Sequence, residues 1–371
     1  MLEIHCPAAA LMAARNFLGD RHVSLGVGIV GCGMIAKFHA KAIADAVGAD
    51  FIGATSRRQE STDAFLAVVP GKSYSSVQSM CQDPDIDLVS ICTPSGAHLE
   101  PAIIAAQAGK HVIIEKPLEI TLERCDKIIR ACQDNNVVLS TIFPSRFHKA
   151  SQHLKKAISG GRFGTLTLGD AYVKWFRTQA YYDSGAWRGT WDLDGGGALM
   201  NQAIHSVDLL LWLMGPVRQL SAQTATLAHD RIEVEDVATA SLQFANGALG
   251  VIQATTAAFP GMLKRIEVHG SQGSAVIEEE DIKMWTFDKS DDLDASILEE
   301  LTGKTETGGG ASDPSAIGHH GHTAQFNDVI SAIQNGTQPL IDGLEGRHSV
   351  EVILAIYEAA KKQQTVVLPI R

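Results

Sequence analysis

Three polar residues, Asn201, His205 and Asp208, follow a run of glycines and have residue types suited to acid–base chemistry. Offsets of four and three residues place side chains on one face of an α-helix, so we expect the three to line one wall of a site. The glycines at 195–197 let the chain turn and let a ligand approach the backbone closely. An imidazole has an ordinary pKa of about 6.5, which makes His205 a candidate to exchange a proton with a substrate.

Lys116 is the second candidate for acid–base chemistry. It follows Glu115 at the end of an apolar run, 111–114, which is typical of a buried strand. The carboxyl ends of strands in an open α/β sheet form its ligand-binding edge, so we expect Lys116 to face a ligand. Burial and a neighbouring cofactor would have to lower the lysine pKa. The alternatives are a surface ion pair between Lys116 and Glu115, and a buried structural histidine at 205.

The elements that must position these residues fall into two groups. From 23 to 144, short apolar runs alternate with amphipathic helical patterns, which is typical of a doubly wound parallel sheet. After 145 the strands become closely spaced with turn signals between them, which predicts an α+β domain with a large, mostly antiparallel sheet. We expect an extension at 1–22, a ligand-binding domain at 23–144 and a substrate-binding and oligomerisation domain at 145–371. Residues 288–318 have little periodicity and predict a long loop.

Composition narrows the function classes. The 371 residues suffice for two domains, and 45% hydrophobic with 20% charged residues is the balance of a globular protein. A net charge of −11 argues against nucleic acid as a partner, and the longest apolar runs are too short to span a membrane. Six cysteines without a Cys-x-x-Cys pair predict buried thiols in a reducing compartment, so we expect a cytoplasmic protein.

A glycine-rich turn follows the first predicted strand and opens the next helix. Gly31 and Gly33 allow a tight turn against a pyrophosphate, Met34 and Ile35 begin the helix, and Ala36 replaces the third glycine of the dinucleotide fingerprint. The N-terminus of the helix would supply free N–H groups to the phosphates. This motif predicts a Rossmann domain that binds NAD(P), with a structural glycine turn as the alternative.

The end of the second predicted strand bears on the choice between the two dinucleotides. NAD recognition uses an acidic residue there, whereas this strand ends in Ser56 and Arg57. Serine offers a hydroxyl, and arginine can hold a phosphate with paired donors, so the sequence favours NADP slightly over NAD. The alternative is that the arginines here are ordinary solvated residues at the start of a helix and bind no phosphate.

Thr93, Pro94 and His98 follow the next strand at the same edge of the sheet. A threonine and a constrained backbone are suited to lining a nicotinamide or its ribose, so we count these residues, together with Glu115 and Lys116, among the cofactor-binding candidates. The alternative is a simple strand-to-helix turn capped by Ser95.

An aromatic segment between the two predicted domains is the candidate substrate wall. Residues 175–188 hold five aromatic residues and two arginines. Tyr181 and Trp187 could stack on a sugar or cyclitol while Arg177 and Arg188 donate hydrogen bonds to its hydroxyls. The alternative is a hydrophobic cluster that pins a loop. We expect His320 in the histidine-rich segment 319–322 to reach the substrate, and we expect no metal there.

The motif at 31–36, the Glu115-Lys116-Pro117 element and the glycine–histidine segment at 196–208 together resemble the glucose-fructose oxidoreductase / inositol dehydrogenase / MocA family. The resemblance extends over almost all of 23–369. It implies a nicotinamide-dependent oxidoreductase that acts on a sugar, cyclitol or related polyol. Lys116 matches the lysine that touches substrate and nicotinamide ribose, and His205 matches the acid/base histidine. Asn201 stands where the family often has aspartate.

We therefore expect oxidation of a secondary alcohol of a cyclic polyol, such as myo- or scyllo-inositol or a pyranose sugar, to the ketone or lactone. Lys116 and His205 would handle the proton, and Asn201 would orient the substrate because an amide cannot accept a proton. An NADPH-dependent keto-sugar reductase is the closest alternative, and a non-catalytic dinucleotide sensor is an alternative of another class. The free face of the second sheet predicts a homo-oligomer.

Overall fold

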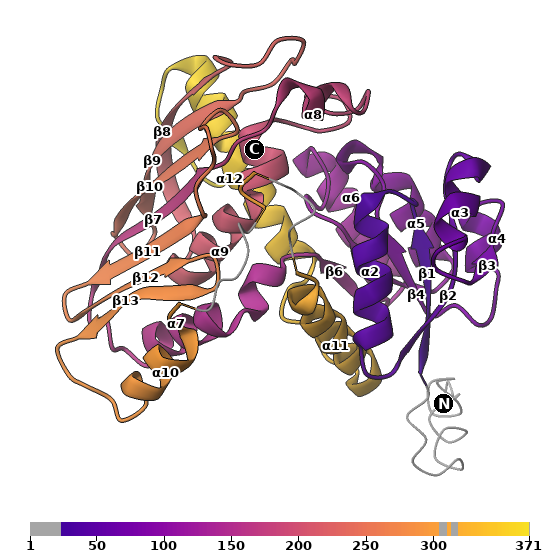
Figure 1. The fold of residues 1–371 in the computed structure, drawn as a ribbon, viewed down its shortest axis with the longest axis horizontal. Coiled ribbons are helices and arrows are strands. Elements are labelled where there is room, and N and C mark those ends of the chain that lie inside the picture. Colours follow the sequence, from indigo (N-terminus) through magenta and orange to yellow (C-terminus); the bar gives the residue numbers. More distant parts are fainter. Residues whose placement is uncertain (1–23, 304–309, 313–317, 371) are drawn as a thin grey trace, which may run out of the picture.

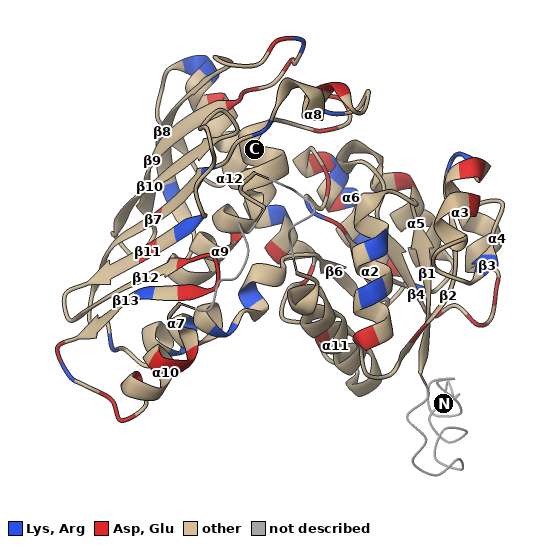
Figure 2. Cartoon of the chain, viewed as in Figure 1, with Lys and Arg blue, Asp and Glu red and all other residues tan. Residues whose placement is uncertain are grey.

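The computed structural model describes residues 24–303, 310–312 and 318–370, so the N-terminal extension expected at 1–22 lies outside the described residues. The described chain builds two sheets with helices between and around them (Figure 1). None of the described helices is both long and apolar enough to cross a membrane. Acidic and basic residues are interspersed along the ribbon in both halves of the molecule (Figure 2).

The first sheet has six parallel strands in the order β3-β2-β1-β4-β5-β6, and this order confirms the predicted doubly wound fold. Its central strands are buried on both faces, as expected for a sheet covered by helices on each side. The strands are β1 (Leu25–Val30), β2 (Ala49–Thr55), β3 (Lys72–Ser73), β4 (Leu88–Ile91), β5 (His111–Ile114) and β6 (Leu139–Thr141).

Helices cover both faces of this sheet. On one face α2 packs against α11, a helix from the far end of the chain, and the two share an apolar core with β1. Helix α11 falls in the predicted second domain, 145–371, but it packs on the first sheet. On the other face α5 packs against α6. The helices are α2 (Met34–Asp45), α3 (Gln59–Leu66), α4 (Val77–Cys81), α5 (Leu99–Gln107), α6 (Leu122–Asp134) and α11 (His320–Asn335).

The second sheet has eight strands in the order β13-β12-β11-β7-β10-β9-β8-β14. The β10–β7 pair is parallel and the other pairs are antiparallel, as predicted. The strands are β7 (Leu166–Lys174), β8 (Val217–Ala225), β9 (Val237–Phe244), β10 (Leu249–Thr255), β11 (Arg265–Gly270), β12 (Gly273–Glu278), β13 (Asp281–Phe287) and β14 (Val366–Val367).

Helices cover only the face of the second sheet that is turned toward the first (Figure 1). Side chains of β9 alternate between buried and exposed, as a sheet with one covered face requires. The predicted loop at 288–318 is wrong in part, because α10 lies within it and packs on β13. The covering helices are α7 (Lys149–Ser159), α9 (Ile204–Met214), α10 (Asp294–Leu301) and α12 (Gly343–Lys362).

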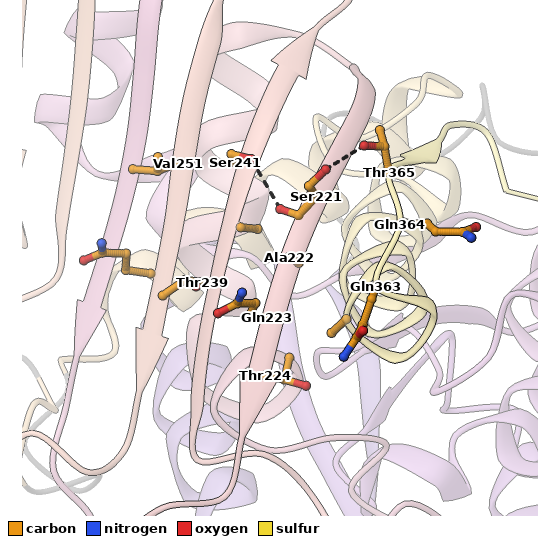
Figure 3. A pocket seen from close by; sticks show the side chains of 13 residues that line it. Ser221, Ala222, Gln223, Thr224, Thr239, Ser241, Val251, Gln363, Gln364 and Thr365 are labelled. Atoms are coloured by element: carbon orange, nitrogen blue, oxygen red, sulfur yellow. Dashed lines mark hydrogen bonds between the residues drawn. The ribbon is translucent and has the colours of Figure 1, made fainter.

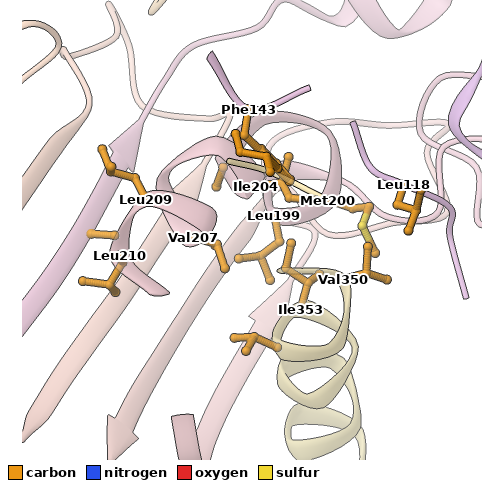
Figure 4. Packing of buried hydrophobic residues seen from close by; sticks show 14 of the residues in the cluster. Leu118, Phe143, Leu199, Met200, Ile204, Val207, Leu209, Leu210, Val350 and Ile353 are labelled. Atoms are coloured by element: carbon orange, nitrogen blue, oxygen red, sulfur yellow. The ribbon is translucent and has the colours of Figure 1, made fainter. Parts of the chain in front are cut away.

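One apolar core connects the glycine–histidine segment to α12 (Figure 4). A π-helical stretch, Ala198–Ala203, runs directly into α9. Leu199, Met200 and Ile204 are fully buried, and Figure 4 shows Leu199 and Met200 beside Val350 and Ile353 of α12. This packing fixes the segment that carries His205 against the rigid part of the second domain.

Candidate active site

The glycine turn at the end of β1 has the shape that a dinucleotide needs. Gly31 has a φ of +94°, and a Cβ there would lie 2.7 Å from the backbone carbonyl of Cys92, so only glycine fits. A Cβ on Gly33 would meet no atom within 4 Å, so this residue borders open space before the first turn of α2. That turn carries no acidic residue and begins with Met34 and Ile35. The turn therefore fits a pyrophosphate at the helix N-terminus.

The end of β2 carries no carboxylate beside this turn. Ser56 is half-buried and its hydroxyl donates to the carbonyl of Arg58 at 2.8 Å. Arg57 is exposed, and its guanidinium makes no hydrogen bond to another described residue. Both residues lie directly after β2, and their role toward a 2′-phosphate stays a prediction.

Thr93 and Pro94 follow β4 at the same edge, where the Thr93 hydroxyl donates to the carbonyl of Ala97 at 2.9 Å. His98 is fully buried, and its ring nitrogens lie 2.9 Å from the Pro117 carbonyl and 3.0 Å from the Thr93 carbonyl. This corrects the expectation that His98 touches the cofactor: its ring bridges the two loops behind the site surface. Burial lowers the pKa of His98, although the two carbonyls act against this shift.

Lys116 meets the glycine–histidine segment, although 85 residues separate the two partners in sequence. Its Nζ donates to the backbone carbonyl of Asn201 at 2.7 Å. Burial lowers the pKa of Lys116 despite the opposing charges of Glu115 and Asp194. A lysine that exchanges protons near neutral pH needs such a lowered pKa, as expected from the sequence.

His205 points its imidazole into the same region. Its Nδ1 is buried and has no hydrogen-bond partner among the described residues, and Phe143 packs edge-on at a centroid distance of 5.9 Å. Burial, and next the charge of Lys116, hold the pKa of His205 well below its ordinary value. Burial thus favours the neutral imidazole, which is the form that can accept a proton.

Asp208 does not share the site with Asn201 and His205, which corrects the prediction of three polar residues on one wall. Its carboxylate accepts hydrogen bonds from Nε and Nη2 of Arg146 at 2.8 and 2.7 Å, and both side chains are buried. The helical spacing was misread because Asn201 lies in the π-helical stretch and not in a regular α-helix. Asp208 therefore stabilises the fold.

A polar network surrounds Asn201. Its Nδ2 donates to the carboxylate of Asp194, and its Oδ1 accepts from Nε2 of Gln202 at 3.0 Å. Oε1 of Gln202 accepts a hydrogen bond from Nη2 of Arg177 at 2.9 Å, and its Nε2 also donates to the Tyr181 hydroxyl at 3.0 Å. Asp194 and Gln202 were missed in the sequence, although Asp194 directly precedes the glycine run.

The two arginines of the aromatic segment have different surroundings. Arg177 is 2% exposed, and its Nη1 and Nη2 donate to backbone carbonyls at 176, 310 and 311 and to Gln202. Arg188 donates to the Tyr181 hydroxyl at 2.6 Å and stacks over the rings of Tyr181 and Trp187. Its remaining donors have no hydrogen-bond partner among the described residues. Arg188 is thus the freer donor toward a ligand.

Glu115 is held by two histidines that come from different helices. Its Oε1 lies 2.8 Å from Nε2 of His39 and 3.7 Å from Nε2 of His322. Burial would raise the pKa of Glu115, but these two histidines hold it well below its usual range. His320 is exposed and stacks on His319, so His322 is the histidine of this segment that lies near the site.

Two histidines and a carboxylate this close are a set that could ligate a metal. His39 Nε2 bonds Glu115 and His39 Nδ1 lies 2.7 Å from the Ser90 hydroxyl, whereas the buried Nδ1 of His322 has no hydrogen-bond partner among the described residues. The expectation of no metal stays a prediction.

Comparisons with known proteins match both halves of this arrangement. Residues 25–143 match the oxidoreductase family with an NAD-binding Rossmann fold, and residues 151–276 match the GFO/IDH/MocA C-terminal domain. The chain belongs to the GFO/IDH/MocA family. Within this family it is an oxidoreductase that binds NAD(P), as the resemblance implied.

Several relatives are similar over much of the chain. Myo-inositol 2-dehydrogenase of Thermotoga maritima is 32% identical over 67% of this chain and 73% of its own length. Levoglucosan dehydrogenase of Pseudarthrobacter phenanthrenivorans is 29% identical over 93% of this chain and 98% of its own. The WlbA dehydrogenase of Bordetella pertussis, solved with NADH and UDP-GlcNAcA, has a TM-score of 0.85 at 34% identity and covers 95% of this chain and 100% of its own.

Proposed function

We propose that the protein oxidises a secondary alcohol of a cyclic polyol or sugar to the ketone or lactone. The observation that carries the proposal is the hydrogen bond from Lys116 to the backbone of Asn201, in the segment that also holds His205. This contact lies at the same edge of the sheet as the turn shaped for a dinucleotide. The names of the inositol and levoglucosan dehydrogenases support this substrate class.

The bound nicotinamide supplies a hydride acceptor. The chain's own residues bind the alcohol and remove its proton. The neutral imidazole of His205 accepts that proton, and Lys116 donates a hydrogen bond to the same oxygen as charge develops on it. Asn201 orients the hydroxyl through its amide. The reverse reaction uses the same groups, so reduction of a keto-sugar is the alternative direction.

The test is the initial rate of nicotinamide reduction with inositols, hexoses and hexonolactones for the wild type, Lys116→Ala and His205→Ala. Loss of a general acid or base typically costs about 10²- to 10⁴-fold, so we expect each variant to lose at least about 100-fold in kcat/KM. Lys127→Ala is the matched control, because Lys127 is 53% exposed on α6 and pairs with Glu123. Turnover by Lys116→Ala at the control's rate would refute the proposal.

We further propose that NADP is preferred over NAD. The open position of Arg57 and the absence of a carboxylate among Thr55–Arg58 at the end of β2 support this choice. Arg57→Ala should weaken NADP binding by about tenfold or more and leave NAD binding unchanged. Equal affinity of the wild type for both dinucleotides would contradict the preference.

An anionic sugar is a second candidate substrate, and Arg188 is the observation that favours it. A guanidinium with unused donors over two aromatic rings can bind a carboxylate in a bidentate manner. The relative from Bordetella pertussis was solved with UDP-GlcNAcA, which carries such a group. Arg188→Ala should then raise KM for UDP-GlcNAcA but not for inositol. Arg231→Ala is the control, because Arg231 is 64% exposed and pairs with Asp183.

The remaining proposal is a homo-oligomer formed through the outer face of the second sheet. Leu168 and Leu249 are partners in the β10–β7 register and are both exposed. Beside them lies a shallow polar depression formed by β8, β9 and β10 and the segment after α12, where the Ser221 and Thr365 hydroxyls are 2.7 Å apart (Figure 3). Sedimentation of the wild type and of Leu249→Arg tests this, since a wild-type monomer would refute it. We also propose a cytoplasmic location, because the cysteines within the described residues are free thiols: Cys32, Cys81, Cys92, Cys125 and Cys132.

A further inference from the structure

The active site contains a buried carboxylate that the roles proposed above do not use. Asp194 is 1% exposed. One of its oxygens accepts from Nδ2 of Asn201, and the other accepts from the backbone N–H of Gly189 at 2.8 Å. A buried carboxylate is costly unless hydrogen bonds and opposite charges compensate it. We therefore ask what this buried carboxylate does for Asn201.

Asp194 determines how the Asn201 amide is oriented. An ionised carboxylate only accepts hydrogen bonds, so the NH₂ end of the amide must face Asp194. The carbonyl end then faces Gln202, whose Nε2 donates to it at 3.0 Å, and Arg177 fixes Gln202 in turn. One N–H and one lone pair of Asn201 are left for a substrate hydroxyl.

Asp194 also provides negative charge to a site rich in cations. Burial raises the pKa of Asp194 to about 6, although the Gly189 N–H, Asn201, Lys116 and Arg188 all act against the rise. The carboxylate is therefore ionised above about pH 6. The ionisable groups that surround it are Lys116 after β5, Arg188, Tyr181 and Tyr182 in the aromatic segment, and Glu235 beneath the glycine run.

We propose that Asp194 is the positioning carboxylate of this active site, which holds the Asn201 amide toward the substrate hydroxyl and supplies the negative charge that position 201 lacks. This inference rests on the proposed roles of Lys116 and His205. Asp194 lies seven residues before Asn201 in the sequence and is in hydrogen-bond contact with it. Asp194 does not touch the substrate and acts through Asn201.

The decisive experiment exchanges the two residues. In Asp194→Asn, the introduced amide has one acceptor oxygen for two donors, so either the Gly189 N–H loses its acceptor or Asn201 must flip its amide or lose its partner. We expect kcat/KM to fall by about 10- to 100-fold. In the double variant Asp194→Asn/Asn201→Asp, the amide introduced at position 194 donates to the carboxylate introduced at position 201. The same amide still accepts from the Gly189 N–H, so the pair is restored with its direction reversed. We expect the double variant to recover to within about fivefold of the wild type.

Asp192→Asn is the matched control, because Asp192 is an exposed carboxylate two positions away. The pH profile of kcat/KM between about pH 5 and pH 9 separates positioning from mere stability. We expect the acid limb near pH 6 to disappear in Asp194→Asn, whereas a limb caused by Glu235, whose pKa burial raises to about 7, would persist. Circular dichroism and dinucleotide binding show whether each variant is folded.

A second measurement does not depend on turnover. The rate at which acetic anhydride labels Lys116, followed by mass spectrometry, reports the lysine pKa, which Asp194 raises. We expect faster labelling in Asp194→Asn and the wild-type rate in the double variant. If no polyol is oxidised but labelling changes in this way, the proposed function fails, whereas the negative charge that Asp194 supplies beside Lys116 is supported. Wild-type labelling and kcat/KM in folded Asp194→Asn, or a folded double variant no more active than Asp194→Asn, would overturn the inference.

Discussion

Replacing Asp208 with asparagine should destabilise the protein while leaving the chemistry of the folded enzyme intact. Asp208 is fully buried, and Arg146 is 2% exposed with two hydrogen bonds to it at 2.8 and 2.7 Å. The amide nitrogen introduced at position 208 would face a guanidinium donor, so the variant leaves a buried positive charge without its counter-charge. This substitution distinguishes the role predicted from the sequence, a residue of the site wall, from the role seen in the structure, a buried partner of Arg146.

The magnitude follows from what remains around Arg146. Breaking a buried ion pair from one side costs about 3–5 kcal/mol. Nη1 of Arg146 keeps an ion pair with Glu345 at 2.6 Å, and the Glu345 side chain is 37% exposed. Because this partner compensates part of the charge, we expect the lower end, about 3 kcal/mol, or roughly a hundredfold in the unfolding equilibrium.

Urea unfolding followed by tryptophan fluorescence measures this loss. Trp212 is a local probe, because the Arg146 guanidinium lies 5.6 Å from its ring centroid. Asp192→Asn, which removes an exposed carboxylate, is the control and should stay within about 0.5 kcal/mol of the wild type. A loss below about 1 kcal/mol in Asp208→Asn would refute the structural assignment. So would a folded Asp208→Asn variant that has lost about a hundredfold in kcat.

Three further predictions concern other parts of the fold. Gly31→Ala should lower the melting temperature by several degrees more than Gly33→Ala, because only Gly31 combines a positive φ with a Cβ position 2.7 Å from Cys92; equal melting temperatures would contradict the geometry. Gly33→Asp should raise the dinucleotide Kd more than about tenfold in a fluorescence titration, because it places a negative charge where the pyrophosphate binds, while Gly33→Ala should change it less than about threefold. The hydrogen bond from Arg162 lowers the pKa of Asp294 to about 2, so the carboxylate stabilises the fold above its ordinary pKa of 3.8 and loses this effect as the pH falls toward 2. Thermal unfolding should therefore show Asp294→Asn to be about 1.5–3 kcal/mol less stable at pH 7, with a difference that shrinks in acid.

Local sequence signals predicted most elements of the fold. Strand β5 has the bounds of the apolar run at 111–114 from which it was predicted, because an apolar run reports local burial. The two-residue strand β3 and the five-residue α4 were missed because each is too short to show a period. Helix α10 was missed in a polar segment, where it depends on packing against β13 and α7.

The sequence by itself determined the dinucleotide turn and the family, because Gly31 and Gly33 act through backbone conformation and space beside their own strand and helix. Only the tertiary structure decided which carboxylate is near the reaction. Asp208 is paired with Arg146 from a distant segment, whereas Asp194 reaches Asn201 across the glycine turn. Helical spacing predicts which side chains share a face, but the partner that each one meets depends on how separate elements pack. The lowered pKa of His205 has the same origin, since burial is a property of the folded chain.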